Sequence, residues 1–245
     1  MAGHSHWASI KHKKGAADAK KGKLFSKLAR ALQIAAKEGG GNPDSNLKLQ
    51  YAIEEARAAN MPRENIERAI KRGTGEIAGV TYESVTYEGY GPGGVAVMVE
   101  CLTDNKNRTA HEIRKIFENN GGNLGASGCV AYLFQRKGAI TIPLSAAGED
   151  QMMADALEAG AENMEVSGDA YLITCIPQDF EAVKKALGAK YPLRSSELTL
   201  LPKDYVKVDE ETGRKVLALM DALDDSDDVQ KVHTNFELPE TLVKS

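Results

Sequence analysis

Residues 139–201 read AITIPLSAAGEDQMMADALEAGAENMEVSGDAYLITCIPQDFEAVKKALGAKYPLRSSELTLL. Short runs with the character of strands alternate here with stretches of helical period. The predicted elements are strand 139–144, helix 149–160, strands 163–167 and 170–176, helix 178–188 and strand 196–201. This order, βαββαβ, is typical of the ferredoxin-like split unit. We therefore expect residues 137–203 to fold as one α/β domain.

The segments on either side of this stretch supply the elements of a second α/β domain. The glycine-rich turn 89–94 joins two β-rich runs as a hairpin, and Thr109 and Glu112 match a capping box that opens a helix. The predicted elements are strands 80–87 and 95–102, the helix from Thr109 to Gly121, strands 129–134 and 205–208, helix 210–223 and strand 229–236. We expect residues 78–136 plus 204–245 to form a discontinuous ferredoxin-like βαββαβ domain into which residues 137–203 are inserted.

The first 77 residues predict a helical domain that follows a basic arm. Residues 1–21 lack any apolar period, which is typical of an arm. Three helices follow, at 22–39, at 43–60 with Asn42 as the N-cap, and at 62–73. The fold class is therefore α+β with three domains, one helical and two ferredoxin-like, one of which is inserted in the other.

Charge is divided sharply along the chain. Up to Gly75 there are 15 Lys/Arg and 7 Asp/Glu, a balance of +8, and the remainder holds 16 and 28, a balance of −12. A segregated positive pole on a chain of net charge −4 indicates a polyanionic partner. The aspartates between 221 and 228 read as a solvated acidic helix end.

The candidate binding residues lie in the basic stretch from His4 to Arg30. Lysine and arginine neutralise phosphates and release counterions without reading sequence. Trp7 is a candidate to stack on an unpaired base or, alternatively, to pack in the core or an interface. We expect phosphate contacts from Lys11, His12, Lys13, Lys14, Lys20, Lys21, Lys23, Lys27 and Arg30. Lys106, Arg108, Arg114 and Lys115 are either a second basic patch or a solvated helix face.

No motif supports catalysis, a cofactor or a small-molecule substrate. Lys115 stands where a helical zinc motif starting at His111 would need its second histidine, and the glycine-rich segments fit neither a dinucleotide fingerprint nor a P-loop. Cys101, Cys129 and Cys175 read as small hydrophobes in a reducing cytosol. Ala2-Gly3-His4 could chelate Cu²⁺ or Ni²⁺ if Met1 is removed, but we expect no resident metal and no enzymatic activity.

The expected location is the cytoplasm. No apolar run approaches the roughly 18–20 residues that span a bilayer. The N-terminal stretch lacks the apolar region of a signal peptide, and it is rich in Lys and Gly where a mitochondrial presequence is rich in Arg and Ser. We therefore expect no membrane association.

Three segments resemble one known family. MAGHSHWASIKHKKGAADAKKGKLFSKLAR (1–30), YEGYGPGGVAVMVECLTDNKNRTAHEIRKIF (87–117) with GGNLGASGCVAYLF (121–134), and LTLLPKDYVKVDEET (198–212) are similar to the YebC/PmpR family of probable transcriptional regulators. The resemblance runs essentially end to end. It implies a cytoplasmic, non-enzymatic, three-domain factor. Some members are described as DNA-binding regulators of transcription, whereas others, including a mitochondrial activator of cytochrome oxidase subunit synthesis, act in translation.

The sequence therefore predicts a nucleic-acid-binding regulator of gene expression, with DNA-binding regulation of transcription as the first interpretation. A translation factor that binds the ribosome or its RNA is the alternative, and a third class is an interaction protein whose arm docks on an acidic protein surface. Target sequence, oligomeric state and domain orientation stay open. The charge split also suggests that the acidic domains shield the arm when no partner is bound.

Overall fold

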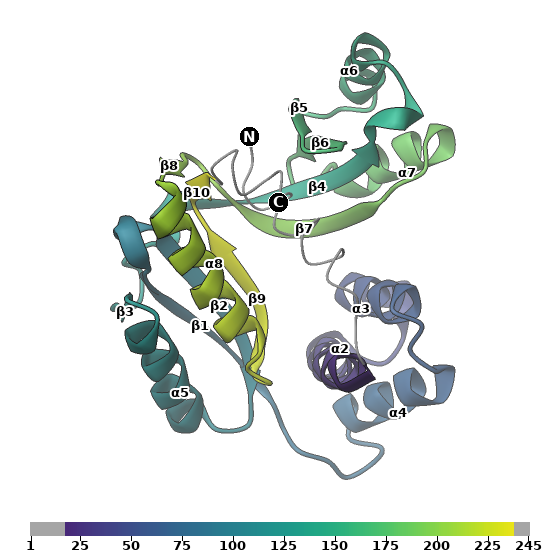
Figure 1. The fold of residues 1–245 in the computed structure, drawn as a ribbon. Helices are drawn as coiled ribbons and strands as arrows, with labels where there is room; N and C mark the ends of the chain where they lie inside the picture. Colours follow the sequence, from purple (N-terminus) through teal and green to yellow (C-terminus); the bar gives the residue numbers. More distant parts are fainter. Residues whose placement is uncertain (1–17, 238–245) are drawn as a thin grey trace.

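The computed structural model describes residues 18–237, with side chains from residue 21 onward. The N-terminal domain packs three helices, α2 (Asp18–Gly39), α3 (Leu47–Ala58) and α4 (Arg63–Gly73), around Leu32, Leu49 and Ile66 (Figure 1). Three helices are expected from the apolar periodicity of the sequence, but α2 begins at Asp18, four residues before the predicted start at residue 22, so residues 18–21 are helical and do not belong to the arm.

One buried side chain sets the junction between α2 and α3. Asn46 accepts a hydrogen bond from the Leu49 amide at 3.1 Å and donates to the carbonyl oxygens of Ala35 and Gly40 at 2.7 and 2.8 Å. It therefore caps α3 and satisfies carbonyls near the end of α2. The expected cap, Asn42, instead caps the single 3-10 turn Pro43–Ser45, so α3 begins four residues later than predicted.

The second domain is built from two distant parts of the chain. Its four-stranded antiparallel sheet has the order β3-β1-β2-β9, in which β9 comes from the C-terminal part. Helices α5 and α8 lie together on one face of this sheet and enclose a core that includes Phe117, Leu219 and Val99 (Figure 1). The elements are β1 (Glu83–Tyr90), β2 (Ala96–Thr103), α5 (Lys106–Asn119), β3 (Asn123–Leu124), α8 (Glu210–Asp224) and β9 (Val229–Thr234).

The inserted domain follows the predicted βαββαβ order. Its antiparallel sheet runs β5-β6-β4-β7, and Ile140, Ile173 and Phe180 lie in its core. The elements are β4 (Phe134–Pro143), α6 (Glu149–Glu158), β5 (Asn163–Ser167), β6 (Ala170–Cys175), α7 (Phe180–Lys190) and β7 (Ser195–Pro202). The fold class, α+β with a helical domain and two antiparallel sheets, is confirmed. The domain boundaries 1–77, 78–136 plus 204–245 and 137–203 stay predictions.

The elements of the discontinuous domain follow one another along the chain in a different order from the predicted βαββαβ. A hairpin, β1-β2, comes first, and α5-β3 and α8-β9 follow, so the connectivity is ββα-β…αβ within a sheet flanked by two helices. The expected strand 205–208 is shortened to β8 (Val206–Lys207), which pairs in parallel with β10 (Phe236–Glu237) in a separate small sheet. The two α/β domains therefore share an architecture and differ in connectivity.

The expected strand 129–134 is wrong, and a buried carboxylate explains why. Glu88 on β1 accepts hydrogen bonds from the backbone amides of Gly128, Val130 and Ala131 at 2.7, 2.9 and 2.8 Å. Amides that bind one carboxylate cannot extend a strand ladder, and the chain forms a 3-10 turn at Ala131–Leu133.

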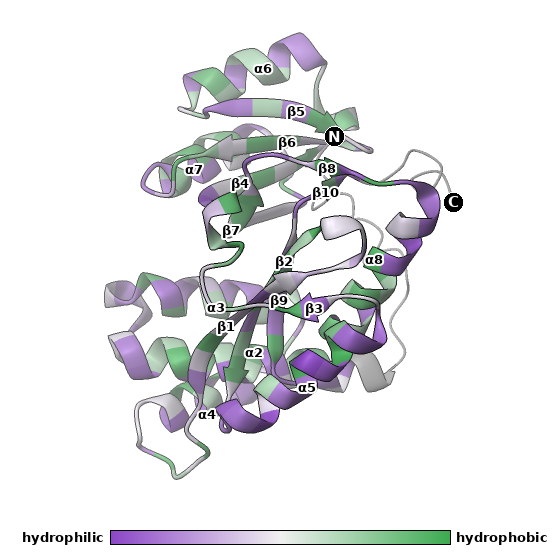
Figure 2. Ribbon diagram, turned by 90° about the vertical axis from the view of Figure 1, so that its left-hand side faces the viewer, coloured by the Kyte–Doolittle hydropathy of each residue, from purple (hydrophilic) through white to green (hydrophobic). Residues whose placement is uncertain are grey.

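Two polar contacts attach the helical domain to the inserted domain. The Tyr51 hydroxyl of α3 donates to Glu181 of α7 at 2.6 Å, and Lys184 of α7 lies 2.7 Å from Glu54 of α3. The rings of Tyr51 and Phe180 meet edge to face with centroids 5.9 Å apart. Figure 2 shows α2, α3 and α4 on one side of the molecule beside both sheets. Among the described residues, none of the helices has the length and apolar character needed to cross a bilayer.

Candidate nucleic-acid interface

Three of the predicted phosphate contacts form one face of α2. Lys23, Lys27 and Arg30 follow one another at i, i+4 and i+7, a spacing that puts them within about 40° of one line on the helix. The buried residues Leu28 and Leu32 of the same helix face the domain core. The three cations therefore point away from the helical domain, and we call them the basic face of α2.

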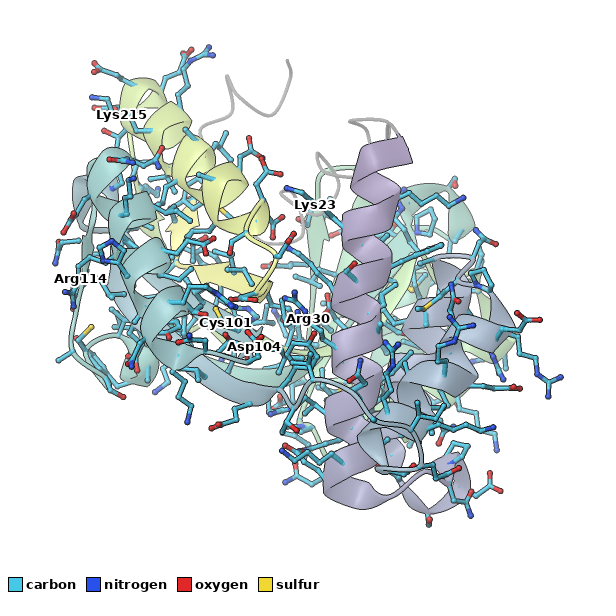
Figure 3. The ribbon with its side chains drawn as sticks, turned by 90° about the horizontal axis from the view of Figure 1, so that it is seen from below. Lys23, Arg30, Cys101, Asp104, Arg114 and Lys215 are labelled. Atoms are coloured by element: carbon cyan, nitrogen blue, oxygen red, sulfur yellow. The ribbon has the colours of Figure 1, made fainter. Side chains whose placement is uncertain are left out.

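The basic face of α2 is occupied by another part of the protein. Its partner is the acidic segment, residues 224–228, which runs from the end of α8 to the start of β9. Lys23 donates to the carbonyl oxygen of Asp225 at 3.0 Å, and Lys27 donates to that of Asp224 at 2.6 Å. Figure 3 shows Lys23 and Arg30 projecting from α2 into the space between the two domains.

The end of α8 favours such contacts for a general reason. The last carbonyl groups of a helix have no partner within it, and they carry the negative end of the helix dipole. Ammonium groups donate to these oxygens and are attracted to this end. Lys23 and Lys27 therefore act as a C-terminal cap for α8 that is supplied by a helix about 200 residues away.

Asp228 is the centre of the contact. Its side chain is 5% exposed, and Arg30 Nη1 lies 2.9 Å from its Oδ1 atom. On the other carboxylate oxygen, Arg108 Nη2 lies at 2.8 Å and the Thr109 hydroxyl at 2.7 Å. Arg30 also donates to the carbonyl oxygen of Asp227. Burial alone would raise the pKa of Asp228, but the bonds from Arg108 and Thr109 and the charge of Arg30 hold it below the ordinary value.

An open cleft of about 400 Å³ lies at this junction. The Arg30 guanidinium stacks over the Tyr82 ring at one wall, 5.1 Å from its centroid. The lining combines three cationic side chains with five carboxylates: Lys23, Arg30 and Arg108 with Asp104, Glu112, Asp225, Asp227 and Asp228. Within the described residues there is no group of three His, Cys, Asp or Glu side chains that could hold a metal ion.

The other predicted contacts divide into two groups. Lys21 is exposed, and its ammonium group lies 5.8 Å from the centre of the Phe25 ring. The remaining ones fall outside the described side chains: Trp7, Lys11, His12, Lys13, Lys14 and Lys20. Ala2-Gly3-His4 lies there as well. The binding roles of all these residues stay predictions.

Two interpretations from the sequence change at this junction. The acidic helix end is not simply solvated, because Asp228 is buried and bound by two arginines. Thr109 does not open α5. The helix begins one turn earlier, at Lys106, because Asn105 accepts a hydrogen bond from the Arg108 amide at 3.1 Å, and Thr109 is buried against Asp228. The only sequence signal for Asp228 is its position directly before the apolar strand at Val229.

The suggested second basic patch consists of Lys106, Arg108, Arg114 and Lys115, and two of these residues bind different acidic side chains. Lys106 lies 2.5 Å from Glu83, and Arg108 lies 2.7 Å from Asp104 in addition to binding Asp228. Figure 3 shows Arg114 on the outer side of α5, away from the junction. The four residues therefore do not act as one patch: Arg108 lines the same cleft as Lys23 and Arg30 and shares Asp228 with Arg30, whereas Arg114 lies away from it.

The cysteines are free thiols, as the sequence indicated. Cys101 and Cys175 are buried, and Cys129 is half-buried. Burial raises the pKa of Cys101 to about 12, so its thiol stays protonated at neutral pH.

The ion pairs of Asp228 are expected to make the free energy of unfolding depend on pH in the acidic range. Because its pKa is lower in the folded protein than the ordinary 3.8, its contribution is complete above that value and is lost as the pH falls toward the folded pKa. The wild type should therefore have a higher free energy of unfolding in urea than Asp228→Asn at neutral pH, and this difference in free energy should narrow below about pH 4. A difference that stays constant down to about pH 2 would contradict this assignment.

Comparison with known proteins places the whole chain. The models for the TACO1/YebC N-terminal domain and the TACO1/YebC second and third domain match residues 5–76 and 82–236. A probable transcriptional regulatory protein of Dictyoglomus turgidum is 58% identical over 100% of this chain and 99% of its own. The probable transcriptional regulatory protein YrbC of Bacillus subtilis is 53% identical, and the match covers 96% of this chain and 99% of that protein.

A solved structure agrees in fold. The crystal structure of a conserved hypothetical protein from Aquifex aeolicus, Aq1575, is 50% identical and has a TM-score of 0.85. The match covers 96% of this chain and 97% of that one. Both the sequence models and the full-length relatives thus agree with the resemblance found in the sequence, and the chain belongs to the TACO1/YebC family.

Proposed function

We propose that this protein is a non-enzymatic regulator of gene expression that binds nucleic acid in the cytoplasm. The first candidate function is that of a DNA-binding regulator of transcription. The names of its full-length relatives support regulation of transcription. The observation that carries nucleic-acid binding is the basic face of α2, whose three cations are among the nine Lys/Arg of the first 40 residues, a stretch with only two acids.

The proposed binding is electrostatic. Lys11, Lys13 and Lys14 in the arm and Lys23, Lys27 and Arg30 on α2 would each neutralise a phosphate and release a counterion. Six such contacts predict a log–log salt slope of about −5 on duplex DNA. Binding of this kind brings the protein to DNA and does not by itself select a sequence.

Titration of the full chain with duplex DNA over a salt series tests this function. We expect a steep salt slope from the phosphate contacts. A regulator of transcription should in addition bind a promoter fragment more tightly than a scrambled duplex of equal length, a preference that groups other than these cations must supply. Binding that is weak and identical for both duplexes would refute the transcriptional role. A flat salt dependence would refute phosphate contacts.

A second candidate function is that of a translation factor on the ribosome or its RNA. Trp7 and the imidazoles of His4, His6 and His12 favour it, because aromatic rings stack on unpaired bases at about 1–3 kcal/mol for each base, and single-stranded loops in RNA offer such bases. Co-sedimentation with ribosomes from a cell extract, combined with weak DNA binding, would establish this alternative.

Nuclease treatment separates both nucleic-acid functions from the third class, an interaction protein. Partners captured from an extract through nucleic acid are lost after digestion. Partners that survive digestion and bind only while residues 1–21 are present would show that the arm docks on protein.

A further inference from the structure

The acidic segment presents the basic face of α2 with the groups that a nucleic acid would offer. Carbonyl oxygens from Asp224, Asp225 and Asp227 and the carboxylate of Asp228 accept hydrogen bonds from the three cations. Phosphate oxygens are acceptors of the same kind and carry full charge. The four aspartates of the segment add negative charge around the contact. The segment therefore occupies the donors that would bind a phosphate backbone.

The contact is built so that it can open at low cost. Lys23 is exposed and donates only to a backbone carbonyl oxygen, so water can take its place as the donor when the lysine leaves. If Arg30 leaves, Asp228 keeps hydrogen bonds from Arg108, Thr109 and Thr103 at 2.8, 2.7 and 3.2 Å. Opening therefore leaves no buried carboxylate without a partner, which would be the expensive outcome.

The rest of the helical domain does not depend on this contact for attachment. Tyr51 and Glu54 of α3 are bound to Glu181 and Lys184 of α7 in the inserted domain. None of these residues belongs to α2 or to the acidic segment. The helical domain can thus stay attached through α3 while the basic face of α2 changes partner.

We propose that the acidic segment is an internal competitor for nucleic acid: it covers the basic face of α2 in the free protein, and the phosphate backbone of a bound nucleic acid displaces it. This inference rests on the proposed function. It assigns the basic face of α2 as the folded part of the binding surface and gives the acidic segment an autoinhibitory role. Free protein would consequently bind more weakly than its basic residues alone predict.

Removing charge from the acidic segment tests the competition. In Asp224→Asn/Asp225→Asn/Asp227→Asn the backbone carbonyls and Asp228 remain, but three negative charges are lost. The matched control, Glu118→Gln/Glu149→Gln/Asp150→Asn, removes three exposed acids elsewhere. In about 50 mM salt we expect the segment variant to bind a duplex and a single-stranded oligonucleotide about tenfold more tightly than the control, with the gap closing in high salt.

Each outcome decides between the two proposals. Tighter binding by the segment variant alone supports the competition, including the case where only this variant binds measurably. Equal affinities for the segment variant and the control overturn the competition and leave the proposed function standing. If no form binds either oligonucleotide or ribosomal RNA, the proposed function fails and this inference with it. The double variant Asp225→Asn/Asp227→Asn, which changes only exposed side chains, replaces the triple variant if that one does not fold.

Discussion

Deletion of residues 2–17 is expected to weaken binding of duplex DNA on the order of 10- to 100-fold at low salt. The deleted stretch holds Lys11, Lys13 and Lys14, and α2 begins directly after it at Asp18. Loss of three phosphate contacts should also make the log–log salt slope shallower by about three. Fluorescence anisotropy of a labelled duplex over a salt series measures both quantities.

This deletion leaves α2 intact, whereas removal of residues 1–21 would also remove the first turn of α2. The fold should be unaffected, and equal thermal unfolding curves would show it. Deletion of residues 238–245, the other terminal stretch outside the described residues, is the control and should leave the slope unchanged. If the shortened protein binds as tightly as the full chain, the arm is not the binding element, and the folded basic residues must account for any affinity.

Replacement of Asp228 by Ala is expected to lower the free energy of unfolding by about 3 kcal/mol at neutral pH. The carboxylate is 5% exposed and joins Arg30 of α2 to Arg108 of α5. Without it, two guanidinium groups face each other across the junction, and the buried hydroxyl of Thr103 loses its acceptor, whereas Thr109 can still donate to the carbonyl oxygen of Asn105. Urea unfolding followed by circular dichroism measures the change.

Asp227→Ala is the matched control for this effect. It lies next to Asp228 and is exposed, and Arg30 contacts only its backbone carbonyl oxygen. Its replacement should change stability by no more than about 0.5 kcal/mol. Equal effects of the two replacements would show that net charge in the acidic segment, and not the buried network, determines stability here.

The two proposals connect through Arg30. In the free protein its guanidinium links the helical domain to the discontinuous domain, and in the proposed complex it binds a phosphate. Salt screens both the contact of Arg30 with Asp228 in the free protein and its contact with a phosphate in the proposed complex. Both contacts therefore weaken as ionic strength rises. Affinities for this protein should therefore be compared at several salt concentrations before any residue is assigned a role.

The elements of this protein follow largely from local sequence. The helix and strand order of residues 139–201 and the three N-terminal helices were predicted from periodicity, because each element buries one face and its apolar spacing shows which. The family was also evident from contiguous segments, and the charge split located the basic face of α2. These features depend on residues near one another in the chain.

Tertiary structure alone decided the contacts between distant segments. Arg30 and Asp228 are 198 residues apart, and Glu88 binds amides about 40 residues away. No periodicity connects such residues, so the acidic segment looked solvated and residues 129–134 looked like a strand. Buried carboxylates must find donors wherever the fold brings them. That requirement changed the secondary structure of residues 129–134 and gave Arg30, a predicted phosphate contact, a bridging role between domains in this structure.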